Sequence, residues 1–244
     1  MVGLEKNCRA LYEQAFGASA RFDDALFSLV MPQCLRVIAT GDTPKTMLFS
    51  IPYTLISENG PTEARYVYAV ATSPAFRGKG LATRLLREVI AEGVPLFLRP
   101  MSPELFGFYR SVGLVPVSPV KTLQGAADDG GERLPFQTLS PDAYLTARTA
   151  YLTPPYTAPT AAFLSLGFLG GGALCLPERF VAFYEMHGER VLFKEWLGDI
   201  AYASRAAAFL GACTYELRTS DASGTPFGMA ANCPEGMTFL IALD

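Results

Sequence analysis

A strand, a glycine loop and a helix follow one another between residues 65 and 90, and this succession restricts the fold more than any other feature. Residues 65–72 (RYVYAVAT) are rich in β-branched and aromatic side chains, which predicts a strand. The loop that follows contains Arg77-Gly78-Lys79-Gly80, and an apolar stripe with helical spacing begins at Leu81. Glycines let backbone N–H groups converge, and a helix N-terminus carries a partial positive charge. The segment is therefore predicted to hold a phosphate or a pyrophosphate.

Two common phosphate-binding patterns do not fit this loop. The dinucleotide-binding pattern G-x-G-x-x-G/A has Thr83 at its third small position, and Arg99 follows the next strand where an acid belongs. The Walker A pattern requires Gly-Lys-Ser/Thr, but Gly80 follows Gly78-Lys79 here. The pattern R/Q-x-x-G-x-G/A does fit, over residues 77–82.

A second motif follows at a regular distance. Pro95–Leu98 is predicted to be the next strand, and Ser102–Val112 the next helix, with Ser102 as N-cap and Pro103 at the first helical position. This helix contains the Phe108-Tyr109 pair, and Gly113-Leu114 follows it, close to an F-Y-x-x-x-G-F signature.

The two motifs together resemble the GCN5-related N-acetyltransferases (the GNAT superfamily). The resemblance implies an α/β (α+β) fold class, with a mixed, mostly antiparallel sheet flanked by helices. From the residues alone, an ordinary βαβ crossover with a glycine turn stays open as the alternative reading of residues 65–98.

The resemblance also implies acetyl-CoA (coenzyme A) as co-substrate and no metal. In this superfamily the loop amides hold the pyrophosphate, and the preceding strand splays from its neighbour and hydrogen-bonds the pantetheine arm. We expect the backbone N–H of Val70 to polarise the thioester carbonyl. The cofactor-binding residues expected on this basis are Val70, Ala71, Thr72, Arg77, Gly78, Lys79, Gly80, Leu81, Ala82 and Thr83.

Tyr109 and Tyr68 are the candidate catalytic residues. Tyr109 matches the position of the superfamily's tyrosine, which implies a general acid for the leaving thiolate. We favour this role over core packing because Phe106, Phe108 and Tyr109 cannot share one helix face. Ser102 stands where relatives often have an asparagine near the pantetheine, and it is alternatively only a helix cap.

No general base stands out in the sequence. Even spacing predicts that Tyr66, Tyr68 and Val70 point to one face of their strand, with Glu63 nearby. Tyr68 then lines the acceptor pocket or, equally, packs in the sheet, and a water chain is the other candidate base.

The chain is predicted to form two units of similar build joined by a linker. The expected domains are a catalytic GNAT domain over residues 1–122, a polar, glycine-rich linker over 123–134 and a degenerate GNAT-like domain over 135–244. The first domain is predicted to contain helices at Asn7–Phe16, Phe22–Leu29 and 81–92, and strands at Gln33–Thr40, Thr46–Ser57, Thr62–Thr72 and Leu114–Val120. The second is predicted to contain helices at Ser140–Thr153, Ala161–Phe168 and Asp199–Leu210, and strands at Ala173–Leu176, Phe180–Glu185, Val191–Leu197, Thr214–Arg218 and Thr238–Leu243.

The second unit lacks the chemistry of the first. Only Gly198 separates its strand at 191–197 from the helix at 199–210, and there is no Arg-x-x-Gly. This two-unit arrangement is similar to the enhanced intracellular survival acetyltransferase group of mycobacteria. We expect the sterol-carrier-like domain of that group to be missing from these 244 residues. A role for the C-terminal carboxylate of Asp244 stays open.

Composition sets weaker limits. A net charge of −3 with scattered basic residues gives no indication of nucleic-acid binding. Five widely spaced cysteines without a C-x-x-C pair predict reduced, buried thiols and a cytoplasmic protein. The single histidine, His187, is predicted to lie in an exposed hairpin turn. The largely apolar run 160–176 is broken by Gly170-Gly171-Gly172, so it predicts a short buried helix and a strand rather than a membrane span.

The sequence therefore predicts an acyl-CoA-dependent N-acyltransferase that moves acetyl from acetyl-CoA to a primary amine by direct attack. The expected partner is a small-molecule or peptide amine, with no nucleic acid and no membrane, and homo-oligomer formation stays open. The alternative is a non-catalytic CoA-binding or partner-binding module on the same scaffold. The acceptor amine itself is not indicated by any residue pattern.

Overall fold

The computed structural model describes residues 2–131 and 133–241, which form two compact units. Unit 1 contains residues 2–117 and 228–235, and unit 2 contains residues 118–227 and 236–241. Neither unit is a single continuous segment, because residues 228–235 belong to unit 1 and interrupt unit 2.

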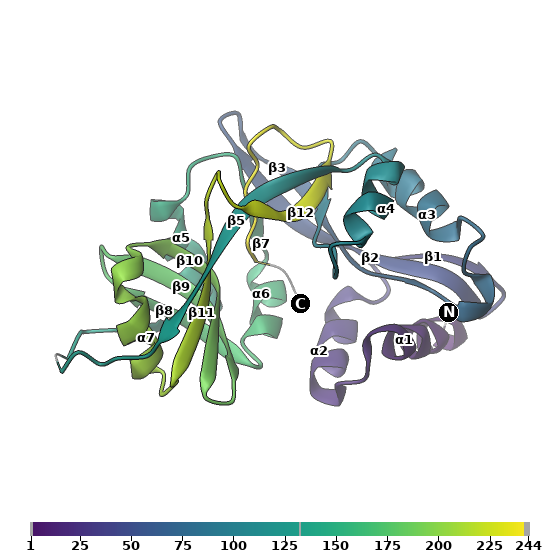
Figure 1. Cartoon of the computed structure of the whole chain (residues 1–244). Coiled ribbons are helices and arrows are strands. Elements are labelled where there is room, and N and C mark those ends of the chain that lie inside the picture. The colour runs from purple at the N-terminus through teal and green to yellow at the C-terminus, as the bar shows by residue number, and fades with distance from the viewer. Residues whose placement is uncertain (1, 132, 242–244) are drawn as a thin grey trace. The chain divides into compact units, whose positions relative to one another are not determined.

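Unit 1 is a sheet with two helices on each face (Figure 1). Its helices are α1 (Val2–Phe16), α2 (Ala20–Val30), α3 (Leu81–Ile90) and α4 (Leu105–Val112). Its strands are β1 (Leu35–Thr40), β2 (Thr43–Ser57), β3 (Gly60–Thr72), β4 (Leu96–Leu98) and the end of β12 (Thr225–Ala231), and a short 3-10 turn spans Pro74–Phe76. These elements match the helices and strands that the sequence predicts in this region, apart from β12, the start of α4 and the start of α1, which was predicted at Asn7.

The strand order in unit 1 is β1-β2-β3-β4-β12. Only the β3–β4 pair is parallel, and α3 connects its two strands. The expected fold class, a mixed and mostly antiparallel sheet flanked by helices, is confirmed.

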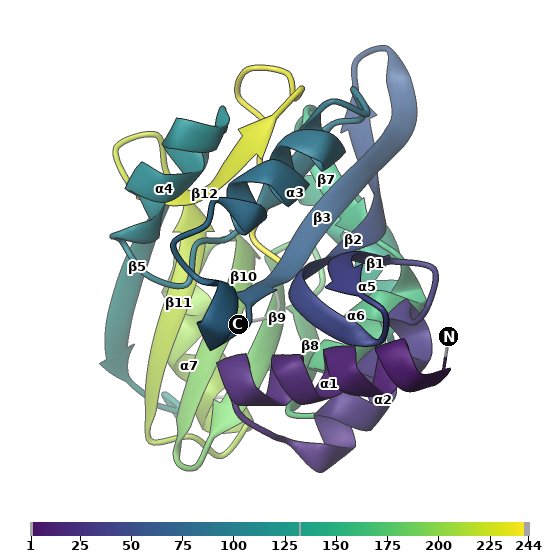
Figure 2. The same ribbon diagram turned by 90° about the vertical axis from the view of Figure 1, so that its right-hand side faces the viewer.

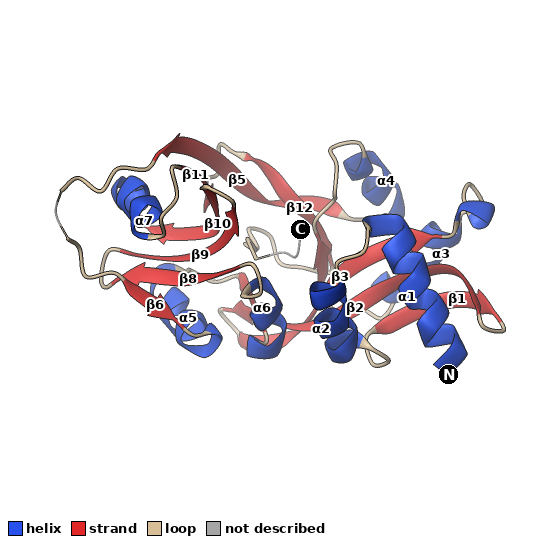
Figure 3. Ribbon diagram, turned by 90° about the horizontal axis from the view of Figure 1, so that it is seen from below, coloured by secondary structure: helices blue, strands red, loops and turns tan. Residues whose placement is uncertain are grey.

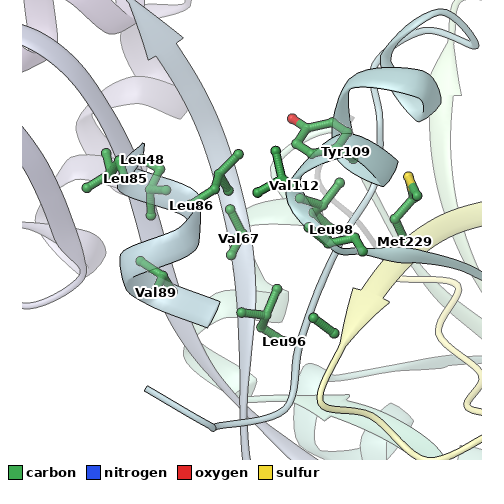
Figure 4. Packing of buried hydrophobic residues seen from close by; sticks show 12 residues of the cluster. Leu48, Val67, Leu85, Leu86, Val89, Leu96, Leu98, Tyr109, Val112 and Met229 are labelled. Carbon is green, nitrogen blue, oxygen red and sulfur yellow. The ribbon is translucent and has the colours of Figure 1, made fainter. Parts of the chain in front are cut away.

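Helices α3 and α4 enclose the core of unit 1 on one face of the sheet. The buried residues of this cluster include Leu48, Val67, Leu85, Leu86, Val89, Leu96, Leu98, Tyr109, Val112 and Met229 (Figure 4). On the other face, Tyr12 of α1 and Phe27 of α2 pack edge to face with ring centroids 5.3 Å apart, and Phe27 packs in the same way on Phe49 of β2. Figure 2 shows α1 and α2 on the side of β2 and β3 opposite to α3.

The fifth strand of unit 1 comes from the C-terminal part of the chain. β12 pairs antiparallel with β4 through Met229↔Leu98, Ala230↔Phe97 and Ala231↔Leu96. The sequence pattern did not predict this strand, since Pro226 and Gly228 weaken the alternation typical of a strand. It instead predicted a last strand at 238–243, where the structure has only an isolated bridge from Thr238 to Tyr156, and residues 242–243 lie outside the described part.

Unit 2 has a sheet of the same kind. Its strands are β5 (Val115–Ala126), β6 (Gln137–Leu139), β8 (Gly171–Leu176), β9 (Phe180–His187), β10 (Arg190–Gly198) and β11 (Thr214–Ser220), with the short β7 (Tyr156–Pro159) apart from them. Its helices are α5 (Pro141–Arg148), α6 (Ala161–Gly167) and α7 (Ala203–Phe209), with 3-10 turns at Thr149–Tyr151 and Ile200–Tyr202. The strand order is β5-β11-β10-β9-β8-β6, and β10–β11 is the parallel pair.

The two faces of the unit 2 sheet are covered by different helices (Figure 3). The alanines of α7 pack with Phe180, Phe193 and Trp196, while α5 and α6 pack with Val181 and Phe183. Under α5, the guanidinium of Arg148 forms a buried ion pair with Glu195, with an Nη2–Oε1 distance of 2.8 Å, and the Tyr144 hydroxyl donates to the same carboxylate. Each polar group of this network therefore has a partner, as burial requires.

The expected domain boundaries differ from the units of the structure. Residues 123–126 of the expected linker are strand, since they pair with 214–217 of β11. Residues 118–122, expected in the first domain, belong to unit 2, and residues 228–235, expected in the second domain, belong to unit 1.

Candidate functional site

A β-bulge interrupts strand β3 just before its end. Phe49 pairs with Tyr68 and Met47 with Ala71, so Ala69 and Val70 together oppose one residue of β2, Leu48. Ala69 has a φ of 54°, in the left-handed region that residues with a Cβ rarely adopt. Nothing in the sequence pattern indicated this bulge, because alanine has no special preference for that conformation.

The bulge changes which backbone groups face the β4 side of β3. Before it, the N–H of Arg65 donates to the carbonyl of Pro95, next to β4, at 2.8 Å. After it, the N–H of Ser73 donates to the carbonyl of Lys45, on the β2 side, at 2.9 Å. Since backbone N–H groups alternate along a strand, those of Val70 and Thr72 face the β4 side.

The side chains change faces in the same way. Tyr66 and Tyr68 lie on the α1 side of the sheet, where Tyr66 packs on Tyr53 and the Tyr68 hydroxyl lies 3.3 Å from that of Tyr12. Val70 instead packs with Val67 against the core under α3. The expectation that Tyr66, Tyr68 and Val70 point together is therefore wrong, because an extra residue in a strand reverses the alternation beyond it.

Strand β3 extends well beyond its parallel neighbour. The described pairing with β4 consists of Arg65↔Leu96 and Tyr66↔Phe97, and β4 ends at Leu98. Beyond Tyr66, β3 continues to Thr72 alongside β2 alone. The N–H groups of Val70 and Thr72 thus face the edge from which β4 has separated, and such an edge can pair with an extended ligand as with another strand.

The glycine loop connects this edge to helix α3. Gly78 and Gly80 have φ values of 72° and 70°, and a Cβ added to either would meet no atom within 4 Å. Gly80 is the N-cap of α3 and provides no side-chain cap, so the first described bond of the helix runs from the Arg84 N–H to the Gly80 carbonyl, at 2.9 Å. The N–H groups of the first turn, Leu81 to Thr83, have no carbonyl partner within the helix, which leaves them available to an anion.

Two cationic side chains belong to this loop. The Arg77 Nε donates to the Thr72 carbonyl at 3.2 Å, and the Lys79 ammonium donates to the Ala75 carbonyl at 3.1 Å. The Lys79 ammonium also lies 5.1 Å from the centroid of the Phe76 ring. Both residues are exposed, so their charges stand at the loop surface beside the α3 N-terminus.

Tyr109 packs in the core between α3 and α4, and no described residue bonds to its hydroxyl. The residue is 7% exposed, and Figure 4 shows its hydroxyl oxygen at the end of the ring away from Met229. Among the described residues, no group forms a hydrogen bond with this hydroxyl. Burial raises the pKa of Tyr109 to about 12, so the phenol keeps its proton at neutral pH.

The phenylalanines beside Tyr109 pack differently from the expectation. Phe106 and Phe108 both contact the same core as Tyr109, with the Phe108 and Tyr109 rings edge to face at 5.1 Å. Separate helix faces therefore do not distinguish Tyr109 from the two phenylalanines. The feature that does is its hydroxyl, which has no hydrogen-bond partner among the described residues.

Helix α4 begins two residues later than the predicted first helical position, Pro103. Its first residue is Leu105 and its N-cap is Glu104, so Ser102 is not the cap. Residues 102–104 form turns instead, with the Leu105 N–H donating to the Ser102 carbonyl at 3.2 Å. Pro103 restricts the residue before it and so disfavours a helical Ser102.

Tyr68 lies on the other face of the sheet from Tyr109 and next to α1. Burial, the Tyr12 hydroxyl and the Asp23 carboxylate raise the pKa of Tyr68, so its phenol stays protonated and is a poor general base. The sequence does not single out Tyr12, because its place in α1 indicates only an amphipathic helix.

Unit 2 has the same strand–helix succession but a different helix start. A bulge at Lys194 interrupts β10, where Phe193 pairs with Tyr184 and Glu195 with Phe183. Asp199 then accepts a hydrogen bond from the Ala201 N–H at 2.9 Å. A carboxylate therefore occupies the position at which unit 1 offers free amides.

A bulged strand that separates from its parallel neighbour and leads into a helix N-terminus without a side-chain cap is the arrangement expected of a GNAT-type fold. The comparisons agree with this class: residues 47–96 match the model of the Acetyltransferase (GNAT) family. No curated protein matches the chain. The resemblance to GCN5-related N-acetyltransferases drawn from the sequence is confirmed.

Solved structures share this fold over nearly the whole chain. A GCN5-related N-acetyltransferase from Anabaena variabilis superposes with a TM-score of 0.69 at 15% identity, over 94% of this chain and 70% of that one. One from Kribbella flavida gives a TM-score of 0.66 at 15% identity, over 93% and 69%. Eis1 from Mycobacterium abscessus gives 0.58 at 13% identity, over 89% of this chain and 62% of Eis1. The two-unit arrangement of the Eis group is thus confirmed at the level of the fold.

The structure also bears on the predictions for the histidine, the cysteines and a membrane span. His187 ends β9 at an exposed hairpin, as predicted. All five cysteines are free, but only Cys8, Cys34 and Cys175 are buried, so the expectation of five buried thiols is wrong for Cys213 and Cys233. Within the described residues, every helix is too short or too polar to cross a membrane.

Proposed function

We propose that this protein is an N-acetyltransferase that transfers the acetyl group of acetyl-CoA to a primary amine. The observation that carries the proposal is the bulge at Ala69, which turns the Val70 N–H toward the open edge of β3. The same strand leads directly into the uncapped N-terminus of α3. A single strand–loop–helix segment thereby offers donors for both an extended arm and a pyrophosphate.

The described residues fit coenzyme A. The N–H groups of Leu81, Ala82 and Thr83, with those of the loop 77–80, suit a pyrophosphate, and Arg77 and Lys79 add positive charge. Gly78 and Gly80 leave open space where side chains would otherwise stand. The strand edge at 70–72 suits the amide groups of pantetheine.

The chemistry assigned to unit 1 is mainly positioning. Acetyl-CoA brings a thioester to this edge, and the Val70 N–H polarises its carbonyl as a preorganised donor. Holding the amine and thioester together can supply up to roughly 7–11 kcal/mol of the barrier. As the amine nitrogen bonds to the acetyl carbon and the carbon–sulfur bond breaks, the Tyr109 phenol, protonated and without a partner among the described residues, donates its proton to the leaving sulfur. The proton that the amine loses returns to Tyr109 through water, which restores the phenol.

The acceptor is proposed to be a primary amine, of a small molecule or a peptide, that attacks directly. Tyr68 is kept as a residue that contacts this acceptor, through hydrogen bonding rather than as a base. The alternative is a non-catalytic module that binds CoA or a partner. The Tyr109 hydroxyl, which has no hydrogen-bond partner within the described part of the chain, favours the enzyme over it.

Release of free thiol from acetyl-CoA tests the proposal. The purified chain is incubated with acetyl-CoA alone and with spermidine, an aminoglycoside or a lysine peptide, and the product is analysed by mass spectrometry. Thiol release that depends on the amine, with an acetylated product, supports the enzyme. Binding of CoA without turnover on any amine favours the non-catalytic CoA-binding module. No binding of CoA rejects both the enzyme and that module, and leaves the partner-binding module.

A further inference from the structure

The C-terminal part of the chain contributes directly to the core beneath the proposed cofactor cradle. Met229 of β12 is fully buried in the cluster that also contains Leu85, Leu86 and Val89 of α3. β12 also forms the outer neighbour of β4, the short strand from which β3 separates. The segment therefore borders both α3 and β4.

Asn232 extends this contact from packing to hydrogen bonding. Its side-chain Nδ2 donates to the carbonyl of Ile90, the last residue of α3, at 2.9 Å, and lies 3.4 Å from the carbonyl of Val94. The Ile90 carbonyl also accepts the Gly93 N–H of the turn after the helix, at 3.1 Å, so the Asn232 amide adds a second hydrogen bond at the end of α3. Asn232 has a φ of 57°, a left-handed conformation that asparagine tolerates better than most residues.

The next residue continues along β4. The Cys233 thiol lies 3.4 Å from the carbonyl of Leu96, the first residue of β4. Asn232 and Cys233 thus bind the end of α3, the turn after it and the start of β4 in succession. They therefore hold β4, which separates from β3, and α3, whose N-terminus belongs to the proposed cradle.

We infer that Asn232 is a positioning residue for coenzyme A: its amide anchors the C-terminal end of α3 and so sets the place of the free N–H groups at the other end. α3 has ten residues and is therefore roughly 15 Å long. A rigid helix of this length transmits a small movement of one end to the other. The inference rests on the proposed function for the identity of the ligand, but not for the hydrogen bond itself.

Three variants separate the side chain of Asn232 from its backbone. Asn232→Gly removes the amide and keeps a residue suited to positive φ. Asn232→Asp keeps the size but replaces the N–H donor with an oxygen that faces two carbonyls. Ser204→Ala is the matched control, since the Ser204 hydroxyl likewise donates to a backbone carbonyl, that of Ala126 in unit 2, at 2.9 Å.

The affinity for CoA by calorimetry, the melting temperature and the amide hydrogen exchange of residues 84–90 are measured for each variant. These N–H groups bond within α3, starting with Arg84 to the Gly80 carbonyl, so their exchange reports how firmly the helix is held. We expect Asn232→Gly to weaken CoA binding roughly 3- to 10-fold, about the effect of one net hydrogen bond. Asn232→Asp should weaken it further, and Ser204→Ala should leave it unchanged. Exchange at residues 84–90 should be faster in both Asn232 variants than in the Ser204→Ala control.

Unchanged CoA affinity and unchanged exchange in Asn232→Gly would overturn the inference. So would an equal loss of affinity in Ser204→Ala, because the effect would then follow general stability. If the unaltered chain binds no CoA, the proposed function fails, whereas hydrogen exchange at residues 84–90 still decides whether Asn232 positions α3.

Discussion

Tyr68 and Val70 lie on opposite faces of the same sheet although they are two residues apart in one strand. Tyr68 meets Tyr12 of α1, and Val70 packs in the core under α3. The left-handed Ala69 between them absorbs the extra residue. One backbone conformation therefore decides both where the Val70 N–H points and which tyrosines can accompany it.

Substitution at Ala69 should affect cofactor binding according to the backbone that the new residue tolerates. Ala69→Gly should bind CoA at least as well as the parent chain, because glycine adopts a φ of 54° freely. Ala69→Val should destabilise the bulge by about 1–3 kcal/mol, since a β-branched residue is strained there. Thermal unfolding and CoA titration measure both effects, and equal CoA affinity in the two variants would argue against a role for the bulge.

Gly80→Asp should weaken acetyl-CoA binding severely while the protein stays folded. The carboxylate would stand at the N-cap of α3, where the proposed pyrophosphate binds, and would both repel it and cap the free amides. Gly188→Asp is the control, because Gly188 also has positive φ and open space, but in the hairpin of unit 2. Calorimetry that finds the parent affinity in folded Gly80→Asp protein would remove the cradle from residues 77–83.

Tyr109→Phe should keep the affinity for CoA and lower turnover by about 10²–10⁴-fold, as expected for loss of a general acid. The ring stays in the core, so stability should change little. Burial raises the Tyr109 pKa to about 12, so ionisation of this phenol should not reduce activity until strongly alkaline pH. Steady-state kinetics with an identified amine test this, and unchanged turnover would leave Tyr109 as a packing residue only.

The full chain should bind one CoA, in unit 1. In unit 2, Asp199 already accepts the Ala201 N–H and places a negative charge at the corresponding helix start. Titration by calorimetry gives the stoichiometry directly. A value of two per chain would show that unit 2 has a cofactor site of its own.

A fragment that ends at Val120 should aggregate or lose activity. It lacks β12, so it exposes the edge of β4 and leaves the place of the buried Met229 empty. Joining residues 225–235 to the fragment through a flexible linker should restore part of its solubility. Light scattering and CoA binding compare the two, and a soluble, fully active fragment without β12 would contradict this account.

The sequence by itself determined the local elements of the proposed cofactor site. The glycines at 78 and 80, the strand before them and the stripe that starts at Leu81 predict a strand–loop–helix anion site because each depends on neighbouring residues only. The Phe108-Tyr109 pair is likewise a local pattern, and it contributed to the resemblance to the GNAT superfamily. Helix and strand positions in both units followed from apolar periodicity, with errors at ends such as Ser102, where a following proline changed the backbone.

Only the tertiary structure decided which distant segments complete the site. The left-handed Ala69, the exchange of β12 into unit 1 and the bond from Asn232 to Ile90 have no local signal, since each depends on residues that are far away in the chain. A weak strand such as 225–231 forms because β4 offers it a paired edge and the core offers Met229 a buried place. Local preferences therefore specified the cradle, and long-range pairing and packing fixed its neighbours and the direction of its donors.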